Sequence, residues 1–157
     1  RGDDIRARAH WYLASIHVEH GRTLEAASHV EKATDIFTEL HDTDWLAWCA
    51  TVHAEIALRR GRPADADAAL ARAKSLAART ENSTLQAEIH RLLANVAIRR
   101  KDNASAIRHL TTALRVAVKH GMHAQAAEAH SELARLHEQA GALREALQHE
   151  RKAAVHA

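Results

Sequence analysis

Fourteen histidines are the residues of this chain that most readily suggest chemistry. Histidines bind a metal or relay protons when several converge on one point, commonly at positions i and i+4 of a helix. No two histidines here have that spacing, and the i,i+3 pairs His17/His20 and His120/His123 would need further ligands. We therefore predict that the histidines pack or lie on the surface, and we predict no metal site and no cofactor.

Six of the histidines also fall into two columns with a period of 40 residues. One column holds His10, His90 and His130, and the other holds His29, His109 and His149. Equivalent positions in a stack of repeats lie at least a helix-packing distance apart, about 8–10 Å, so one metal ion cannot collect a column. A pH response is the alternative, because ordinary histidines titrate near pH ~6.5.

No other feature of the sequence indicates catalysis. There is no glycine-rich phosphate loop, no G-x-S-x-G elbow and no acid–base pair identifiable from spacing. Cys49, the only cysteine, follows Trp48 in a helical pattern, which indicates a buried packing thiol and not a nucleophile. We therefore predict no enzymatic activity and no catalytic residues.

Composition limits the compartment and the class of partner. The formal net charge is only +2 with mixed signs throughout, which argues against direct binding of nucleic acid. No apolar run approaches the ~18 residues of a transmembrane helix, and no signal peptide is visible, so we expect no membrane contact. The single cysteine suits a reducing cytoplasm. The chain begins at Arg1 and stops inside a helical pattern at Ala157, so we expect a piece of a longer protein.

Alanine recurs in four columns at the same spacing of 40 residues, which indicates an internal helical repeat. The columns are Ala7/47/87/127, Ala14/54/94/134, Ala26/66/106/146 and Ala33/73/113/153. Five glycines and one proline leave little room for hairpin turns, so the fold class is all-α. The breakers between apolar faces predict about eight antiparallel helices near 4–20, 23–40, 44–60, 64–80, 84–100, 104–120, 124–140 and 143–157.

Each block resembles the tetratricopeptide repeat in a long, 40-residue form. The third block carries Ala94 in the middle of its first helix and Ala106 and Ala113 in its second, and the fourth block adds Gly141 at its internal turn. The resemblance covers nearly the whole chain. It implies a right-handed α-solenoid of four helix-turn-helix repeats in one domain, residues 1–157. The repeats would span approximately 4–40, 44–80, 84–120 and 124–157.

The resemblance also implies that the first helix of each repeat lines a concave groove that binds partners. Arg91, Asn95 and Arg99 follow one another at i,i+4, so they form a ridge that suits a peptide backbone and a carboxylate. The other predicted groove residues are Arg59 and Glu55 as polar groups and Trp48 and Trp11 as apolar anchors. The alternative is that Arg91 and Arg99 form ion pairs with Glu55, Glu88 or Glu128 on neighbouring helices.

The function that follows is a protein- or peptide-binding scaffold. Because of the resemblance, we expect the sensory or assembly module of a bacterial regulatory protein in the cytoplasm. The second hypothesis is a homo-oligomerisation module, in which the apolar residues Ile5, Trp11 and Tyr12 near the amino terminus pair with another copy, giving a homodimer. A histidine-dependent metal- or pH-responsive module is the third.

Overall fold

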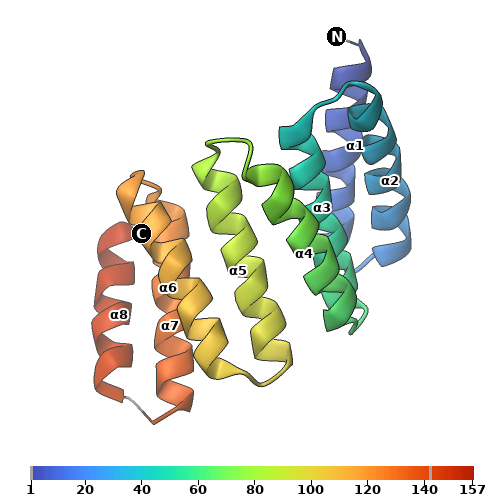
Figure 1. Cartoon of the computed structure of the whole chain (residues 1–157). Helices are drawn as coiled ribbons and strands as arrows, with labels where there is room; N and C mark the ends of the chain where they lie inside the picture. The colour runs from blue at the N-terminus through green and yellow to red at the C-terminus, as the bar shows by residue number, and fades with distance from the viewer. Residues whose placement is uncertain (1, 142) are drawn as a thin grey trace. The chain divides into compact units, whose positions relative to one another are not determined.

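The computed structural model of the chain describes residues 2–141 and 143–157, with only the backbone of Leu143 and Ala146. The described residues form eight helices and no strand, which confirms the all-α repeat fold (Figure 1). The helices are α1 (Gly2–Glu19), α2 (Thr23–Glu39), α3 (Thr43–Arg59), α4 (Pro63–Ala77), α5 (Ser83–Arg99), α6 (Asn103–Lys119), α7 (His123–Gln139) and α8 (Leu143–His156). None of these described helices is both long and apolar enough to cross a membrane.

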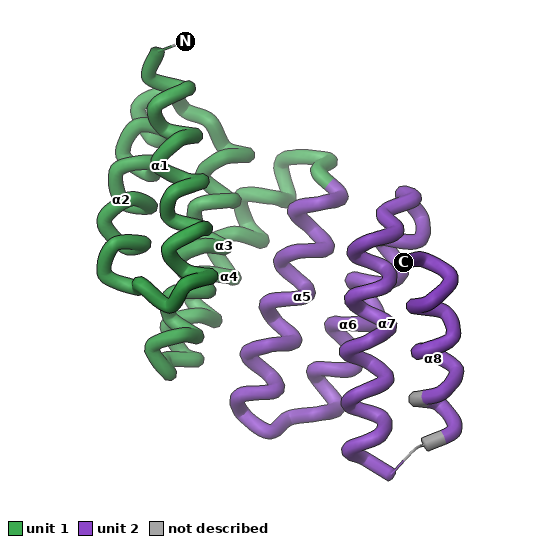
Figure 2. The backbone as a smooth tube through the Cα atoms, turned by 180° about the vertical axis from the view of Figure 1, so that it is seen from behind, with its two compact units in different colours: residues 1–82 green, residues 83–157 purple. Residues whose placement is uncertain are grey.

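Consecutive helices pack as hairpins, α1 on α2, α3 on α4, α5 on α6 and α7 on α8. The chain divides into two compact units, Arg1–Asn82 (unit 1) and Ser83–Ala157 (unit 2), coloured separately in Figure 2. Within unit 1, α3 packs against both α1 and α2, and within unit 2, α6 packs against α7. Each hairpin corresponds to one of the four sequence repeats.

The connection inside each hairpin turns through a residue with positive φ. Gly21, Gly61 and Gly141 adopt φ values of +74°, +69° and +80°, and Lys101 takes the equivalent place in the third repeat with φ +59°. A left-handed backbone strains a residue that carries a Cβ atom, whereas glycine adopts it freely. The third repeat therefore folds with a strained turn that the other three avoid.

Helix α4 ends at Ala77, three residues before the predicted end. The amides of Arg79 and Thr80 bond to the carbonyls of Leu76 and Ala77 at 3.3 and 3.0 Å, which is the tighter i→i+3 pattern of a closing turn. The Thr80 hydroxyl donates to the same Ala77 carbonyl at 3.2 Å and satisfies this end of the helix. Residues 78–82 consequently form a longer connection than the three-residue ones, such as 60–62.

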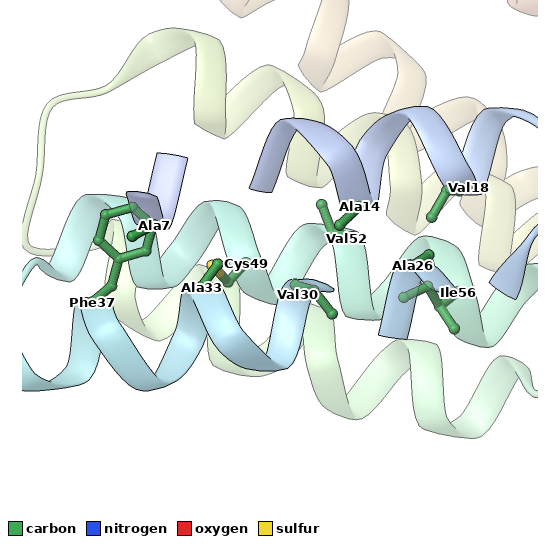
Figure 3. Packing of buried hydrophobic residues seen from close by; sticks show 10 residues of the cluster. All are labelled: Ala7, Ala14, Val18, Ala26, Val30, Ala33, Phe37, Cys49, Val52 and Ile56. Carbon is green, nitrogen blue, oxygen red and sulfur yellow. The ribbon is translucent and has the colours of Figure 1, made fainter. Parts of the chain in front are cut away.

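The core of unit 1 joins small and large side chains from three helices (Figure 3). Alanines of α1 and α2, including Ala7, Ala14 and Ala33, are fully buried there, and Val52 and Ile56 of α3 fill the remaining space. Small residues let helix backbones approach closely, and larger ones interlock between them. The repeat thus places its alanines where the helices are closest.

Most members of the four alanine columns are buried, as helical periodicity predicts. The second column, through Ala14, Ala54, Ala94 and Ala134, is buried in every repeat. In the other columns Ala127 and Ala153 of the last repeat are only half-buried, and the side chain of Ala146 lies outside those described.

Candidate functional site

The predicted ridge lies along α5. Arg91 donates from Nε and Nη2 to the two carboxylate oxygens of Glu88, at 2.9 and 2.6 Å, so the two side chains form a bidentate ion pair within one helix. Asn95 is half-buried one turn further on, and Arg99 is exposed in the last turn. Glu88 is thus one of the partners expected in the alternative, but the pair forms within α5 and not between neighbouring helices, and it orients the guanidinium of Arg91.

The other predicted residues lie in unit 1. Glu55 is half-buried and Arg59 is exposed, and both belong to α3 at i,i+4. Trp48 is half-buried on the same helix, while Trp11 belongs to α1. The structure thus groups the predicted residues into one set on α5 of unit 2 and one set on α1 and α3 of unit 1.

Trp11 is the centre of an aromatic cluster in unit 1. Its ring meets those of Tyr12, Trp45 and Trp48 edge-on, at centroid distances of 5.0, 5.3 and 5.8 Å. Trp45 in turn stacks on the buried Phe37 at 5.3 Å and 7°. Edge-on and stacked aromatic pairs contribute about 0.5–1.5 kcal/mol beyond their buried area. Trp45 and Trp11 therefore both pack against the core of unit 1.

The histidines form contacts that the sequence analysis missed. Within a repeat, the two histidine columns face each other across the hairpin with their Nδ1 atoms in hydrogen-bond range. These histidine pairs are His10–His29 at 2.9 Å, His90–His109 at 3.3 Å and His130–His149 at 2.7 Å. These contacts join residues 19 positions apart, on the two helices of a hairpin, and not residues of one helix or of one column.

The last repeat extends its pair into a larger cluster. His137 stacks on His149 at 5.7 Å, and His156 stacks on His130 at 6.1 Å. His156 also meets His123, with their Nδ1 atoms 3.0 Å apart. At the opposite end, Nδ1 of His137 lies 3.0 Å from a carboxylate oxygen of Glu145. Five of the fourteen histidines therefore lie in one row between α7 and α8.

A histidine pair needs at least one ring to be neutral at Nδ1. One imidazole donates its Nδ1–H and the other accepts with a bare Nδ1, so two fully protonated rings repel each other. Burial lowers the pKa of His10 and His29, and nearby positive charge, including Lys32, lowers both further. Burial likewise lowers the pKa of His130 and His149, helped by Lys152. The His10–His29 and His130–His149 pairs are therefore built for the neutral form.

Among the residues that the structure describes, no group of three or more histidine, cysteine, aspartate or glutamate side chains is arranged to hold a metal ion. Cys49 is buried, and burial raises the pKa of its thiol to about 11, so the thiol stays neutral. A neutral, covered thiol is a packing group, in agreement with the sequence interpretation.

Comparison with known proteins agrees with the repeat architecture. Two models described as Tetratricopeptide repeat match residues 5–80 and 91–157. A search of curated proteins finds none that matches.

Two solved structures share the fold at low sequence identity. The crystal structure of aspartyl phosphate phosphatase F from Bacillus subtilis aligns with a TM-score of 0.90 and 15% identity, over 99% of this chain and 41% of that one. A Rap protein complexed with Competence and Sporulation Factor aligns with a TM-score of 0.89 and 18% identity, over 98% of this chain and 44% of that one. This chain thus spans less than half the length of either structure.

Proposed function

Because this chain belongs to the tetratricopeptide repeat family, we propose that it is a protein- or peptide-binding scaffold, the sensory or assembly module of a bacterial regulatory protein in the cytoplasm. One similar structure is a Rap protein complexed with Competence and Sporulation Factor, and the other comes from Bacillus subtilis. These relatives support a partner-binding role and a bacterial setting. This chain matches 41% and 44% of the lengths of these two structures, so only that part of each bears on the proposal.

The ridge on α5 is the observation that carries the proposal. The ion pair with Glu88 pre-orients the guanidinium of Arg91, which reduces the rotamer entropy lost when a partner binds. Asn95 and Arg99 extend the same face toward the end of the helix. Arginine grips carboxylates and asparagine pairs with peptide groups, so the ridge suits an extended segment that carries an acidic residue.

Unit 1 would supply a second set of contacts to the partner. Trp48 is the apolar anchor that the structure leaves half-buried, and Arg59 and Glu55 follow it along α3. Aromatic and arginine side chains dominate the energetics of most protein interfaces. Trp11 would contribute mainly by holding Trp48 in place, since their rings meet at 5.8 Å.

A peptide-display selection on the purified chain tests this proposal. We expect enriched peptides to carry an acidic residue, and the triple variant Arg91→Ala/Asn95→Ala/Arg99→Ala to bind them at least about 10-fold more weakly. The matched control is Arg115→Ala, an exposed arginine on α6, which should change the affinity less than about twofold. Equal binding by the triple variant and the parent chain would show that the ridge is not the site.

Self-association is a second candidate, favoured by the exposed face of α1. Tyr12 and Ile16 expose 57% and 47% of their surface, whereas Val52 and Ile56, their equivalents one repeat later, are buried in the core of unit 1. This face of α1 therefore lacks the cover that α3 receives, and a second copy would supply it. Light scattering over a range of concentrations tests the idea, because a strict monomer excludes it. Tyr12→Lys/Ile16→Lys should dissociate a dimer.

A further inference from the structure

The second repeat lacks the histidine pair that the other three repeats contain. Ala50 and Ala69 occupy the two positions, and both are replaced together. Two imidazole rings are thereby removed from the hairpin of α3 and α4, and no larger side chain is introduced at either position. The space that the two rings would occupy must either be filled by other side chains or remain empty.

In the structure the space beside Ala50 and Ala69 remains empty. A pocket of about 180 Å³ lies in unit 1, lined by Ala50 and Ala69 together with side chains from α2, α3 and α4. A cavity of about 150 Å³ in another protein is large enough to bind benzene, so this pocket has room for one aromatic ring. Arg72, which is exposed on α4, is among the residues that line it.

The lining combines an apolar floor with a few polar groups. Ala50, Ala69 and the neutral thiol of Cys49 form the apolar part, and Cys49 is labelled in the close view of Figure 3. His53 and Thr34 supply polar groups to the lining. The Thr34 hydroxyl already donates to the carbonyl of Val30 at 2.7 Å, so toward a ligand it can only accept. Burial lowers the pKa of His53, so at neutral pH its ring offers one donor and one acceptor.

The charges around the pocket are of both signs. Glu31 raises the pKa of His53 and Arg72 lowers it, so the two charges act on this ring in opposite directions. Arg72 is the charged residue among those that line the pocket. A neutral aromatic ring needs no charged partner, and its face can contact the guanidinium of Arg72.

From this geometry we propose that the pocket beside Ala50 and Ala69 binds one neutral aromatic ring with a hydrogen-bonding edge, of the phenol or imidazole kind. The ring occupies the space that the chain's own histidines fill in the other repeats. It comes either from a tyrosine or histidine side chain of a partner or from a small molecule. The site uses none of the residues assigned to partner binding above, so the two proposals succeed or fail separately.

Titration with phenol, followed by amide NMR shifts, tests the proposal on the whole chain. We expect shifts at Thr34, Cys49 and His53 that saturate with a Kd on the order of 1 mM, as befits a fragment of this size. Cyclohexanol, which has the hydroxyl but no flat ring, should bind at least about fivefold more weakly. A blocked Gly-Tyr-Gly peptide that binds more tightly than phenol identifies a partner side chain as the source, and one that binds no better identifies a free ring.

The decisive variant restores the missing pair. Ala50→His/Ala69→His should fill the pocket and raise the Kd for phenol more than 10-fold, with helical circular dichroism unchanged. Ala68→His, on the exposed face of α4, is the matched control and should bind phenol as the parent does. If the double variant does not fold, Ala69→Leu fills part of the same space and should weaken binding in the same direction. Undiminished binding in a folded, filled variant, equal binding of cyclohexanol, or no shifts at the lining residues would each overturn the proposal.

Discussion

The pair His130–His149 should behave as one energetic unit. The Nδ1 atoms are 2.7 Å apart and His130 is only 4% exposed, so replacing either histidine by alanine leaves the other ring nitrogen without its partner. An unsatisfied buried polar group costs about 1–3 kcal/mol, so we expect His149→Ala, which leaves the buried His130 without its Nδ1 partner, to lose about 2 kcal/mol of unfolding free energy. His130→Ala leaves the half-buried His149, which water can reach, so we expect a smaller loss from the ring that remains. In a chain of this length, about 1 kcal/mol corresponds to roughly 2–4 °C in Tm.

The double variant His130→Ala/His149→Ala should cost less than the sum of the single variants. The second repeat already carries alanine at both equivalent positions, so the hairpin tolerates the joint replacement. We expect a coupling energy of about 1 kcal/mol in a double-mutant cycle at pH 7.5. This coupling energy is measured by urea unfolding followed by circular dichroism, together with hydrogen exchange of α7 amides. The control is Ser131→Ala, on the exposed side of α7.

The coupling should depend on pH in a defined direction. Burial first, and then neighbouring positive charge, lowers the pKa of both rings below the ordinary value of 6.5. The unfolded chain therefore binds more protons than the folded chain below pH 6.5. The stabilisation is complete above that pH and is lost as the pH falls toward the lowered values. Strictly additive single variants at pH 7.5, or an undiminished coupling at pH 5, would refute this reasoning.

Three further predictions concern stability and reactivity. Phe37→Ala should cost about 3–5 kcal/mol in urea unfolding, because the ring is fully buried and stacked on Trp45, whereas Leu24→Ala at a surface that is 78% exposed should change little. Lys101→Gly should raise the free energy of unfolding by up to about 1 kcal/mol in the same assay, because it removes a left-handed lysine; a loss of stability would contradict this. Alkylation of Cys49 by iodoacetamide at pH 8 should be far slower in the folded chain than in urea, since its pKa is about 11, and equal rates would refute the packing role.

The buried alanine columns could be predicted because they depend on a regular period. Ala14 and its three equivalents face the core in every repeat, and the helix bounds follow from the breakers between them. The end of α4 could not be predicted, because it depends on the local hydrogen bonds of Thr80 and not on periodicity. The period of the sequence therefore predicts which helix faces are buried, whereas the end of a helix depends on the hydrogen bonds of individual residues.

The histidine pairs and the pocket show a different limit. Both depend on which residues of two helices meet across a hairpin, and that register is not visible in either helix alone. A search for residues that change together at a separation of 19 would have found His10 with His29, and Ala50 with Ala69. The role predicted for the groove residues has a different limit, because it depends on a partner and not on the chain itself.

The alanine columns also determine which insertions and deletions the chain can tolerate. One residue inserted within a helix rotates everything after it by about 100°, which would turn the buried alanines of that helix away from its neighbours. Deletions within a helix have the same effect in the opposite sense. Insertions are therefore expected to survive as whole blocks of 40 residues or at the connection 78–82, which lies between helices and is longer than the others. In a library of random insertions, viable clones should concentrate there.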